Sequence, residues 1–363
     1  MARKLVPWLT ADMQGVLHKT LVIRLSSVGD IVLSSPLVRA LHGRYPGCQI
    51  DFLVKEEFAD LVRYNPHVAH VVPFPAGGTP ADLHRLRRLI AASGYDLIID
   101  IHDSLRSRYI AAGATAVTRI NKRKIARALL VRLKIDLYGR FGGAPDVPAR
   151  YAETVRRWDV ADDGLPPEIY FAAADRERAE AQLASGGLAP GARAIGLCPG
   201  ARHGNKRWPA DRFAGCASAL AARHRMPVLI FGAAQEEELC AAVAGGIRSA
   251  LPGVLALNLA GRLSLLETAA AMDRCALVVA NDTGLMHIAA ARGVPLTAIF
   301  GPTVRQFGFF PRGKQTAVVE HPGLACRPCT HIGLPRCPEG HFRCMNEISA
   351  EAVARAAELR MTA

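Results

Sequence analysis

The chain of 363 residues is half hydrophobic and only 6% aromatic, and its 45 Lys and Arg residues outnumber its 32 Asp and Glu residues to give a formal net charge of +13. This length suffices for two domains of ordinary size, and the longest apolar runs, such as 228–234, are too short to span a bilayer. No continuous apolar stretch follows Arg3 and Lys4, so we expect no signal peptide, a cytoplasmic location and no disulfide framework.

The first half of the chain alternates short β runs with amphipathic helical stretches. Residues 1–18 are expected to be an N-terminal extension. Strands are predicted at 21–25, 49–54, 68–72 and 95–101, and helices after residue 30 to about 45 and at 82–93. This alternation predicts a parallel sheet with helices on both faces.

The second half repeats this organisation after a polar, turn-rich stretch, Asp-Asp-Gly-Leu-Pro-Pro, at 162–167. That stretch predicts a boundary between a first domain of residues 19–165 and a second domain of residues 166–345, with a C-terminal helix over 346–363. Strands are predicted at 193–198, 227–232, 276–280 and 296–300, and helices at 175–185, from 209 and at 285–292. The fold class is therefore α/β, with two doubly wound, Rossmann-like domains facing each other across a cleft lined by the loops that follow the strands.

The first of three notable strand-to-helix loops reads Ser-Ser-Val-Gly-Asp over residues 26–30. A helix beginning there offers unpaired N–H groups to an anion or a sugar hydroxyl. Ser26 and Ser27 are therefore candidates for acceptor binding, and Asp30 is a candidate functional carboxylate. Alternatively, Asp30 is only an acid in the first turn of a helix, where the helix dipole favours it.

The second loop, residues 199–209, combines two glycines with three basic residues before a helix. Gly200 would let the backbone approach a ligand closely, and Lys206 could place a point charge on a phosphate. The loop lacks the Walker A pattern. The alternative is a surface loop with incidental basic residues.

The third loop, Asn-Asp-Thr-Gly-Leu-Met-His over 281–287, directly follows a buried strand. Thr283 and the N–H groups of Gly284 and Leu285 would point into the cleft from a helix N-terminus, which suits a diphosphate. Asp282 could accept hydrogen bonds from a sugar or ribose hydroxyl. A capped helix without a ligand is the alternative, but three such loops in two repeated domains favour binding.

Residues 119–140 form a strongly basic segment with eight basic residues and one acid, Asp136, interleaved with hydrophobic residues. This pattern indicates a basic amphipathic segment for an anionic membrane surface or an anionic acceptor, or else a solvated helix face. Nucleic acid is not expected as a partner, because no aromatic stacking platform or known nucleic-acid motif is present.

Two further groups of residues remain to be interpreted. Arg106 and Arg108 follow the strand at 95–101, and we predict that they contact an anionic acceptor, although Arg108 could simply face solvent. Near the C-terminus, the series Cys326-x₂-Cys329-x₇-Cys337-x₆-Cys344 either forms a structural zinc site away from the chemistry or consists of reduced cysteines in a capping loop.

Taken together, the first strand with its loop, Ser34-Ser35-Pro36-Leu37, the 199–208 loop, and the 281–287 loop with Phe300-Gly301-Pro302-Thr303 resemble glycosyltransferase family 9. This family contains the ADP-heptose:lipopolysaccharide heptosyltransferases, and the resemblance runs from about residue 21 to 348. It implies a GT-B fold, an inverting mechanism without a required metal, an ADP-activated heptose donor (ADP-L-glycero-D-manno-heptose) and an acceptor in the lipopolysaccharide inner core. The net positive charge further indicates the cytoplasmic surface of the inner membrane as a partner, with the chain bound there peripherally.

The resemblance also implies residue roles. Asp30 matches the proposed general base, Lys206 the lysine that contacts phosphate, and 282–285 the donor-binding turn, with His287 one helical turn further on. One departure concerns the nucleotide, because Asn258 stands where some members place a glutamate on the ribose.

The expected reaction is a single displacement in which an acceptor hydroxyl attacks as ADP leaves, with domain closure bringing Asp30 and Lys206 together. Four alternative functions stay open. They are a transferase of another nucleotide sugar, a non-catalytic sugar-nucleotide or lipid-binding homologue, an epimerase or phosphorylase on the same fold, and an NAD-dependent enzyme. The last is disfavoured because the first βα turn lacks GxGxxG.

Overall fold

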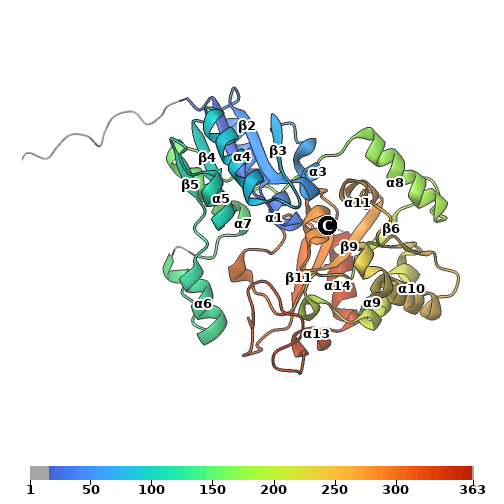
Figure 1. Cartoon of the computed structure of the whole chain (residues 1–363). Helices are drawn as coiled ribbons and strands as arrows, with labels where there is room; N and C mark the ends of the chain where they lie inside the picture. The colour runs from blue at the N-terminus through green and yellow to red at the C-terminus, as the bar shows by residue number, and fades with distance from the viewer. Residues whose placement is uncertain (1–15, 142, 362–363) are drawn as a thin grey trace, which may run out of the picture.

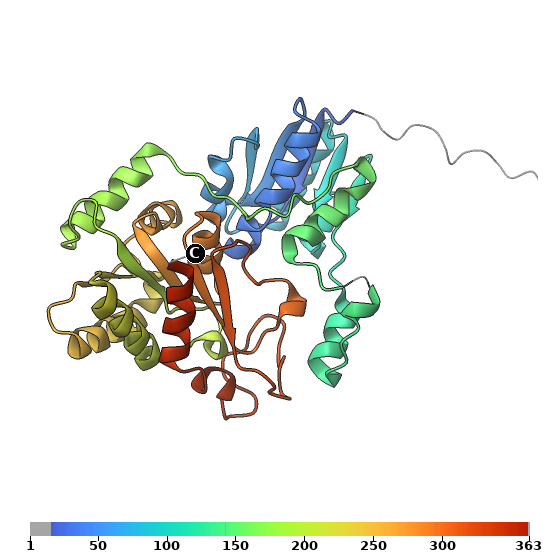
Figure 2. The same ribbon diagram turned by 180° about the vertical axis from the view of Figure 1, so that it is seen from behind.

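The computed structural model describes residues 16–141 and 143–361, which form two β-sheets with helices packed around them (Figures 1 and 2). Most of the predicted N-terminal extension, residues 1–15, lies outside the described residues. Within the described ranges, no helix combines the length and the apolar character needed to cross a membrane.

The first sheet has the strand order β3-β2-β1-β4-β5, and all of its pairings are parallel. Its strands are β1 (Lys19–Ile23), β2 (Gln49–Lys55), β3 (His70–Phe74), β4 (Leu97–Asp100) and β5 (Val117–Arg119). β1 lies at the centre of this sheet. Its apolar residues are buried on both faces, as is typical of a parallel strand in a sheet covered by helices. The helices of this half are α1 (Val28–Val32), α2 (Ser35–Arg44), α3 (Asp60–Arg63), α4 (Pro80–Ala92), α5 (Leu105–Ile110), α6 (Lys124–Leu133) and α7 (Val147–Ala152), with 3₁₀ turns η1 (Glu56–Phe58), η2 (Tyr138–Phe141) and η3 (Glu153–Trp158).

The second sheet has the strand order β11-β10-β9-β6-β7-β8 and is also parallel throughout. Its strands are β6 (Ala194–Cys198), β7 (Val228–Ile230), β8 (Ala256–Asn258), β9 (Cys275–Asn281), β10 (Leu296–Phe300) and β11 (Thr316–Glu320). The helices are α8 (Ala173–Ser185), α9 (Ala210–His224), α10 (Glu237–Ala250), α11 (Leu265–Met272), α12 (Gly284–Ala291), α13 (Arg343–Asn346) and α14 (Ala350–Met361), with 3₁₀ turns η4 (Gly204–Lys206), η5 (Ala234–Glu236) and η6 (Arg305–Phe307).

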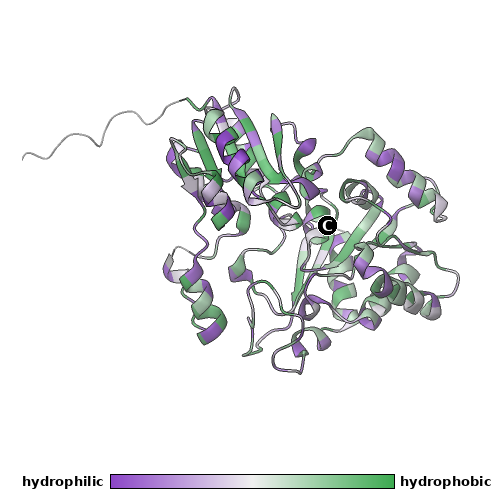
Figure 3. Ribbon diagram, viewed as in Figure 1, coloured by the Kyte–Doolittle hydropathy of each residue, from purple (hydrophilic) through white to green (hydrophobic). Residues whose placement is uncertain are grey.

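The two parallel sheets confirm the predicted fold class, and Figure 3 shows the hydrophobic residues concentrated on the strands of both. The helix predicted to run to about residue 45 is instead divided into α1 and α2. Pro36 stands in the first turn of α2, and proline is favoured at a helix start rather than inside one. Strands β5, β8 and β11 and helices α10 and α11 were not predicted.

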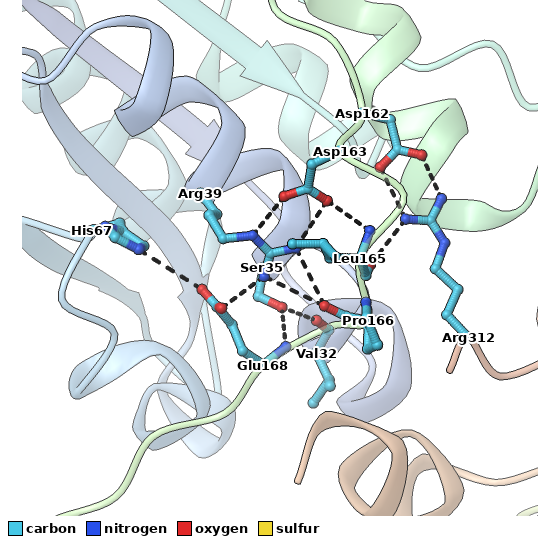
Figure 4. Close-up of polar contacts among 10 residues, drawn as sticks. All are labelled: Val32, Ser35, Arg39, His67, Asp162, Asp163, Leu165, Pro166, Glu168 and Arg312. Atoms are coloured by element: carbon cyan, nitrogen blue, oxygen red, sulfur yellow. Dashed lines mark hydrogen bonds and ion pairs between the residues drawn. The ribbon is translucent and has the colours of Figure 1, made fainter. Parts of the chain in front are cut away.

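The segment between η3 and α8 contains no helix or strand, and the predicted boundary between residues 165 and 166 falls inside it. Arg39 of α2 binds Asp163 (Nε–Oδ2 2.7 Å) and Glu168 (Nη1–Oε2 2.6 Å). From the other half, Arg312 binds Asp162, as Figure 4 shows. Arginines of both halves therefore hold this connecting segment; we call these ion pairs the linker clasp.

Candidate active site

Helices α1 and α12 come from different halves of the chain and face each other directly. A Cβ atom added to Gly29 would lie 2.6 Å from Cδ2 of His287, and one added to Gly284 would lie 2.9 Å from Cβ of Val28. Such distances are too short for a real side chain. The two glycines therefore allow the first and third predicted loops to approach each other across the cleft.

Asp30 on α1 is held in a charged cluster. Arg24, just after β1, places Nη2 2.7 Å from Oδ1 of Asp30, and the two side chains are only 11% and 20% exposed. The Ser27 hydroxyl donates to Oδ2 at 3.0 Å. Burial alone would raise the pKa of Asp30, but Arg24 and the Ser27 hydrogen bonds together bring this pKa below its ordinary value. Asp30 is therefore ionised at neutral pH, as a general base must be.

On the opposite side of the cleft, Lys206 forms an ion pair with Asp282 (Nζ–Oδ2 2.6 Å), and these side chains are 12% and 7% exposed. The hydroxyl of Thr303 donates to the same carboxylate oxygen at 2.8 Å. Lys206 follows β6 and Asp282 follows β9, which are neighbouring strands, so their loops meet at the same sheet edge. Asp282 thus orients Lys206, in addition to any contact with a ligand hydroxyl.

His287 lies one turn into α12 and is only 3% exposed. Burial is the main cause that lowers its pKa to about 4, so the ring is neutral at physiological pH. Its Nδ1 atom has no hydrogen-bond partner among the described residues.

These groups line a cavity of about 310 Å³ shared by both halves of the chain. The first half contributes Ser27, Gly29 and Asp30; the lining also includes Lys206, Asp282, Thr283, Gly284 and His287 from the second half. An adjoining cavity of about 730 Å³ shares Thr283 and Gly284 with it and adds apolar side chains and one carboxylate, among them Phe58, Leu263, Leu265, Leu285 and Glu236. A charged compartment thus opens into a larger, more apolar one, which suits a ligand with an anionic part and an apolar part.

A third cavity, of about 340 Å³, lies on the other side of Asp30. Its lining is strongly basic and includes Arg24, His102, Lys122, Lys124, Arg127 and Arg150. Burial is the main cause that lowers the pKa of His102 to about 4. Asp30 therefore stands between a compartment suited to a nucleoside diphosphate and one suited to an anionic molecule.

Two residues predicted to bind the donor lie outside these cavities. The side-chain oxygen of Asn258 accepts from the N–H of Ala260 at 3.0 Å, which forms a local turn, and Asn258 lines none of the three cavities. A Cβ atom on Gly200 would lie 2.1 Å from the Glu236 carboxyl carbon. Gly200 therefore makes room for Glu236, and Glu236 is the carboxylate that lines the larger cavity.

The predicted acceptor arginines are also not brought to the cavity beside Asp30. Arg106 and Arg108 are exposed on α5, because Ser107 and Ile110 form its buried side, and Arg108 pairs with Asp103 (Nε–Oδ1 2.6 Å). Neither arginine lines the third cavity, and Ser26 lines none of the three.

The four C-terminal cysteines are all reduced. Cys344 is buried in the core of the second half, whereas Cys326 lies 3.8 Å from Nε2 of His341. In the part of the chain that the structure describes, no group of three or more His, Cys, Asp or Glu residues is arranged to hold a metal ion. Burial raises the pKa of the Cys344 thiol, and the thiols of Cys329, Cys337 and Cys326 contribute to this shift. The four cysteines therefore lie near one another, and the structural zinc site stays a prediction.

Sequence reasoning missed several residues that shape the site. Arg24 is a charged residue inside the apolar run 21–25, and that interruption was a usable signal. Asn281 joins the second and third loops, since its amide donates to Pro199 O at 2.7 Å and accepts from Trp208 N at 3.2 Å. No local pattern indicates Glu236.

Two parallel α/β sheets with a nucleotide-sized cavity between them define a GT-B fold, which is the fold of many glycosyltransferases. The model of "Glycosyltransferase family 9 (heptosyltransferase)" matches residues 83–336, and the chain belongs to this family.

The relatives agree with this assignment. The chain is 34% identical over 303 residues to lipooligosaccharide heptosyltransferase 2 of Haemophilus influenzae. This alignment covers 79% of the present chain and 84% of the Haemophilus protein. It is 29% identical over 327 residues to lipopolysaccharide heptosyltransferase 1 of Pseudomonas aeruginosa, and this alignment covers 86% of each protein.

Solved structures share the fold. A family 9 glycosyl transferase of Veillonella parvula superposes with a TM-score of 0.78 at 23% identity, over 95% of this chain and 97% of that one. The ADP-heptose lps heptosyltransferase II of E. coli gives a TM-score of 0.69 at 24% identity, over 95% and 98%.

Proposed function

We propose that this glycosyltransferase transfers heptose from ADP-L-glycero-D-manno-heptose to the inner core of lipopolysaccharide, with inversion at the anomeric carbon. The observation that carries the proposal is the position of Asp30. It belongs both to the cavity that contains Lys206 and Thr283 and to the basic cavity on its other side. A carboxylate between a donor compartment and an acceptor compartment is the arrangement that a single displacement needs.

The donor occupies the two adjoining cavities. The adenosine lies among the apolar residues of the larger one, and the Glu236 carboxylate is available there to ribose hydroxyls. The diphosphate lies at the start of α12, where the unpaired N–H groups of the first turn face it. Asp282, which accepts a hydrogen bond from Thr303, holds Lys206 beside the diphosphate.

The acceptor occupies the basic cavity, where Lys122, Lys124 and Arg127 suit a phosphorylated or carboxylated core sugar. One acceptor hydroxyl attacks the anomeric carbon and passes its proton to Asp30. The bond between that carbon and the phosphate oxygen breaks, and ADP leaves with the bonding electron pair on the opposite face. Lys206 and the start of α12 stabilise the charge that develops on ADP, so we propose that no metal is required.

We further propose that the reaction takes place at the cytoplasmic face of the inner membrane, where the net charge of +13 favours an anionic surface.

The experiment is a comparison of Asp30→Asn with the unchanged protein. Because the amide cannot accept the proton, transfer should fall by about 100-fold or more, while the affinity for ADP stays within about threefold, since Asp30 makes no phosphate contact in this scheme. Normal turnover by the variant would refute the role of Asp30. A parallel screen of ADP-heptose against other nucleotide sugars distinguishes heptosyl transfer from transfer of another sugar.

A further inference from the structure

Helix α6 projects from the first half of the molecule in both views (Figures 1 and 2). One side of it is packed. Ala126 and Leu130 are buried in a small cluster with Tyr138 and Phe307. This cluster joins α6 to a loop of the second half, so the helix has a defined orientation on the body of the protein.

The other side of α6 is apolar but uncovered. Ile125 is 77% exposed and Leu133 is 61% exposed, and Ile135 just beyond the helix is 47% exposed. Ile125, Leu129 and Leu133 are spaced four residues apart, so they lie along one line of the helix. Hydrophobic and hydrophilic bands both appear along α6 in Figure 3. We call this line the α6 stripe.

Unpaired positive charge surrounds the α6 stripe. Among residues 119–140 there are eight basic residues and a single acid. Arg119 is paired with Asp100 at 3.8 Å and Arg123 with Glu153 at 3.0 Å. Lys124, Arg132 and Arg140 form no ion pair with any acid that the structure describes. An aliphatic line flanked by cations has the chemistry of a surface that binds anionic lipids.

The α6 stripe also lies next to the basic cavity. Lys124 and Arg127, on the same helix, line the cavity that contains Asp30. An acyl-anchored acceptor keeps its sugars close to the bilayer surface, so a helix that contacts that surface would bring the cavity to them.

We propose that the α6 stripe inserts into the surface of an anionic bilayer and thereby docks the enzyme beside its acceptor. The occupant of the stripe is the lipid surface: Ile125 and Leu133 enter the boundary between headgroups and acyl chains, and Arg132 contacts lipid phosphates. The proposal rests on the proposed function for the glycolipid nature of the acceptor, but the lipid contact itself needs no heptosyl transfer.

The test is co-sedimentation of the full chain with vesicles made of equal parts phosphatidylcholine and phosphatidylglycerol, without any acceptor. The double variant Ile125→Asp, Leu133→Asp should bind these vesicles about 10-fold or more weakly. The matched control is Leu359→Asp on α14, where Leu359 is 58% exposed, and it should bind as the unchanged protein does. Binding of the unchanged protein should weaken on pure phosphatidylcholine and at high salt.

Activity on a lipid-free core oligosaccharide separates this proposal from the proposed function. The double variant should retain that activity, since neither substituted residue lines a cavity, and should lose activity only on acceptor embedded in vesicles. Equal vesicle binding by the unchanged protein and the double variant would overturn the proposal. Sedimentation velocity supplies a second such outcome: a dimer of the unchanged protein that the double variant abolishes would show that a second copy covers the stripe.

Discussion

The Arg24–Asp30 ion pair makes a quantitative prediction about both stability and pH dependence. Arg24→Met leaves the Asp30 carboxylate buried without its cation. Removing one partner of a buried pair costs about 3–5 kcal/mol, and we take the lower end, about 3 kcal/mol, because Asp30 keeps the hydrogen bonds from Ser27. Chemical denaturation at neutral pH should therefore show a loss of about 3 kcal/mol in the free energy of unfolding.

The sign of the pH effect follows from the same pair. The pKa of Asp30 in the folded protein is below its ordinary value, so the pair stabilises the fold above the unfolded pKa of about 3.9, and this contribution is lost as pH falls through the folded pKa. In Arg24→Met, burial acts without the cation and raises the pKa of Asp30. The loss of stability should therefore be greatest at neutral pH and become smaller in acid.

The assay is the pH profile of kcat/KM for transfer. Its acidic limb should move to higher pH in Arg24→Met, because a larger share of Asp30 is then protonated and cannot act as a base. Arg24→Lys, which keeps a cation, should move the limb much less. An acidic limb at the same pH in all three proteins would refute the assignment of that limb to Asp30 and the electrostatic role of Arg24.

Three further predictions concern the donor side, the cleft and the cysteines. Lys206→Met should raise the Kd for ADP by about 10- to 100-fold in calorimetry, since a hydrogen bond to a charged group contributes about 1.5–3 kcal/mol; unchanged affinity would show that Lys206 does not contact the diphosphate. Gly29→Ala puts a Cβ atom 2.6 Å from the His287 ring, so it should lower stability by about 1–3 kcal/mol in thermal unfolding, and a variant of equal Tm would contradict the close packing of α1 on α12. Elemental analysis of the purified chain decides the role of the four cysteines: about one zinc per molecule would support the structural site, and far less than one would show that the cysteines are reduced and free of metal.

Much of the fold could be predicted from the sequence because its signals are local. Strand β10 occupies the predicted residues 296–300, where an apolar run follows a helix and a proline. The missed strands β5 and β8 have three residues each and include polar residues, whereas the equally short β7, which was predicted, is wholly apolar. β11 is a partly exposed edge strand, so its sequence lacks the apolar run of a central strand.

The site could be predicted only in part, because its pairings join distant residues. Lys206 and Asp282 were both identified as donor residues, but their ion pair depends on β6 and β9 being neighbours. Arg106 was assigned to the acceptor because it follows a strand, yet the helical phase of the short α5 turns it to solvent. Asn258 was chosen by its place in the chain, and its amide is used in a local turn instead.

The connecting segment held by the linker clasp is a suitable point at which to join halves of two related enzymes. Lys206, Asp282 and Thr283 all follow residue 193, whereas Asp30 and the basic residues of helix α6 precede residue 159. Under the proposed function, most of the residues assigned to the donor and most of those assigned to the acceptor are therefore encoded in consecutive stretches of the gene. A chimaera joined between η3 and α8 would test how far each preference follows its own half, since residues of both halves line the cavities. It should work only if both parents supply arginines equivalent to Arg39 and Arg312, because these side chains pair with the acids of the connecting segment.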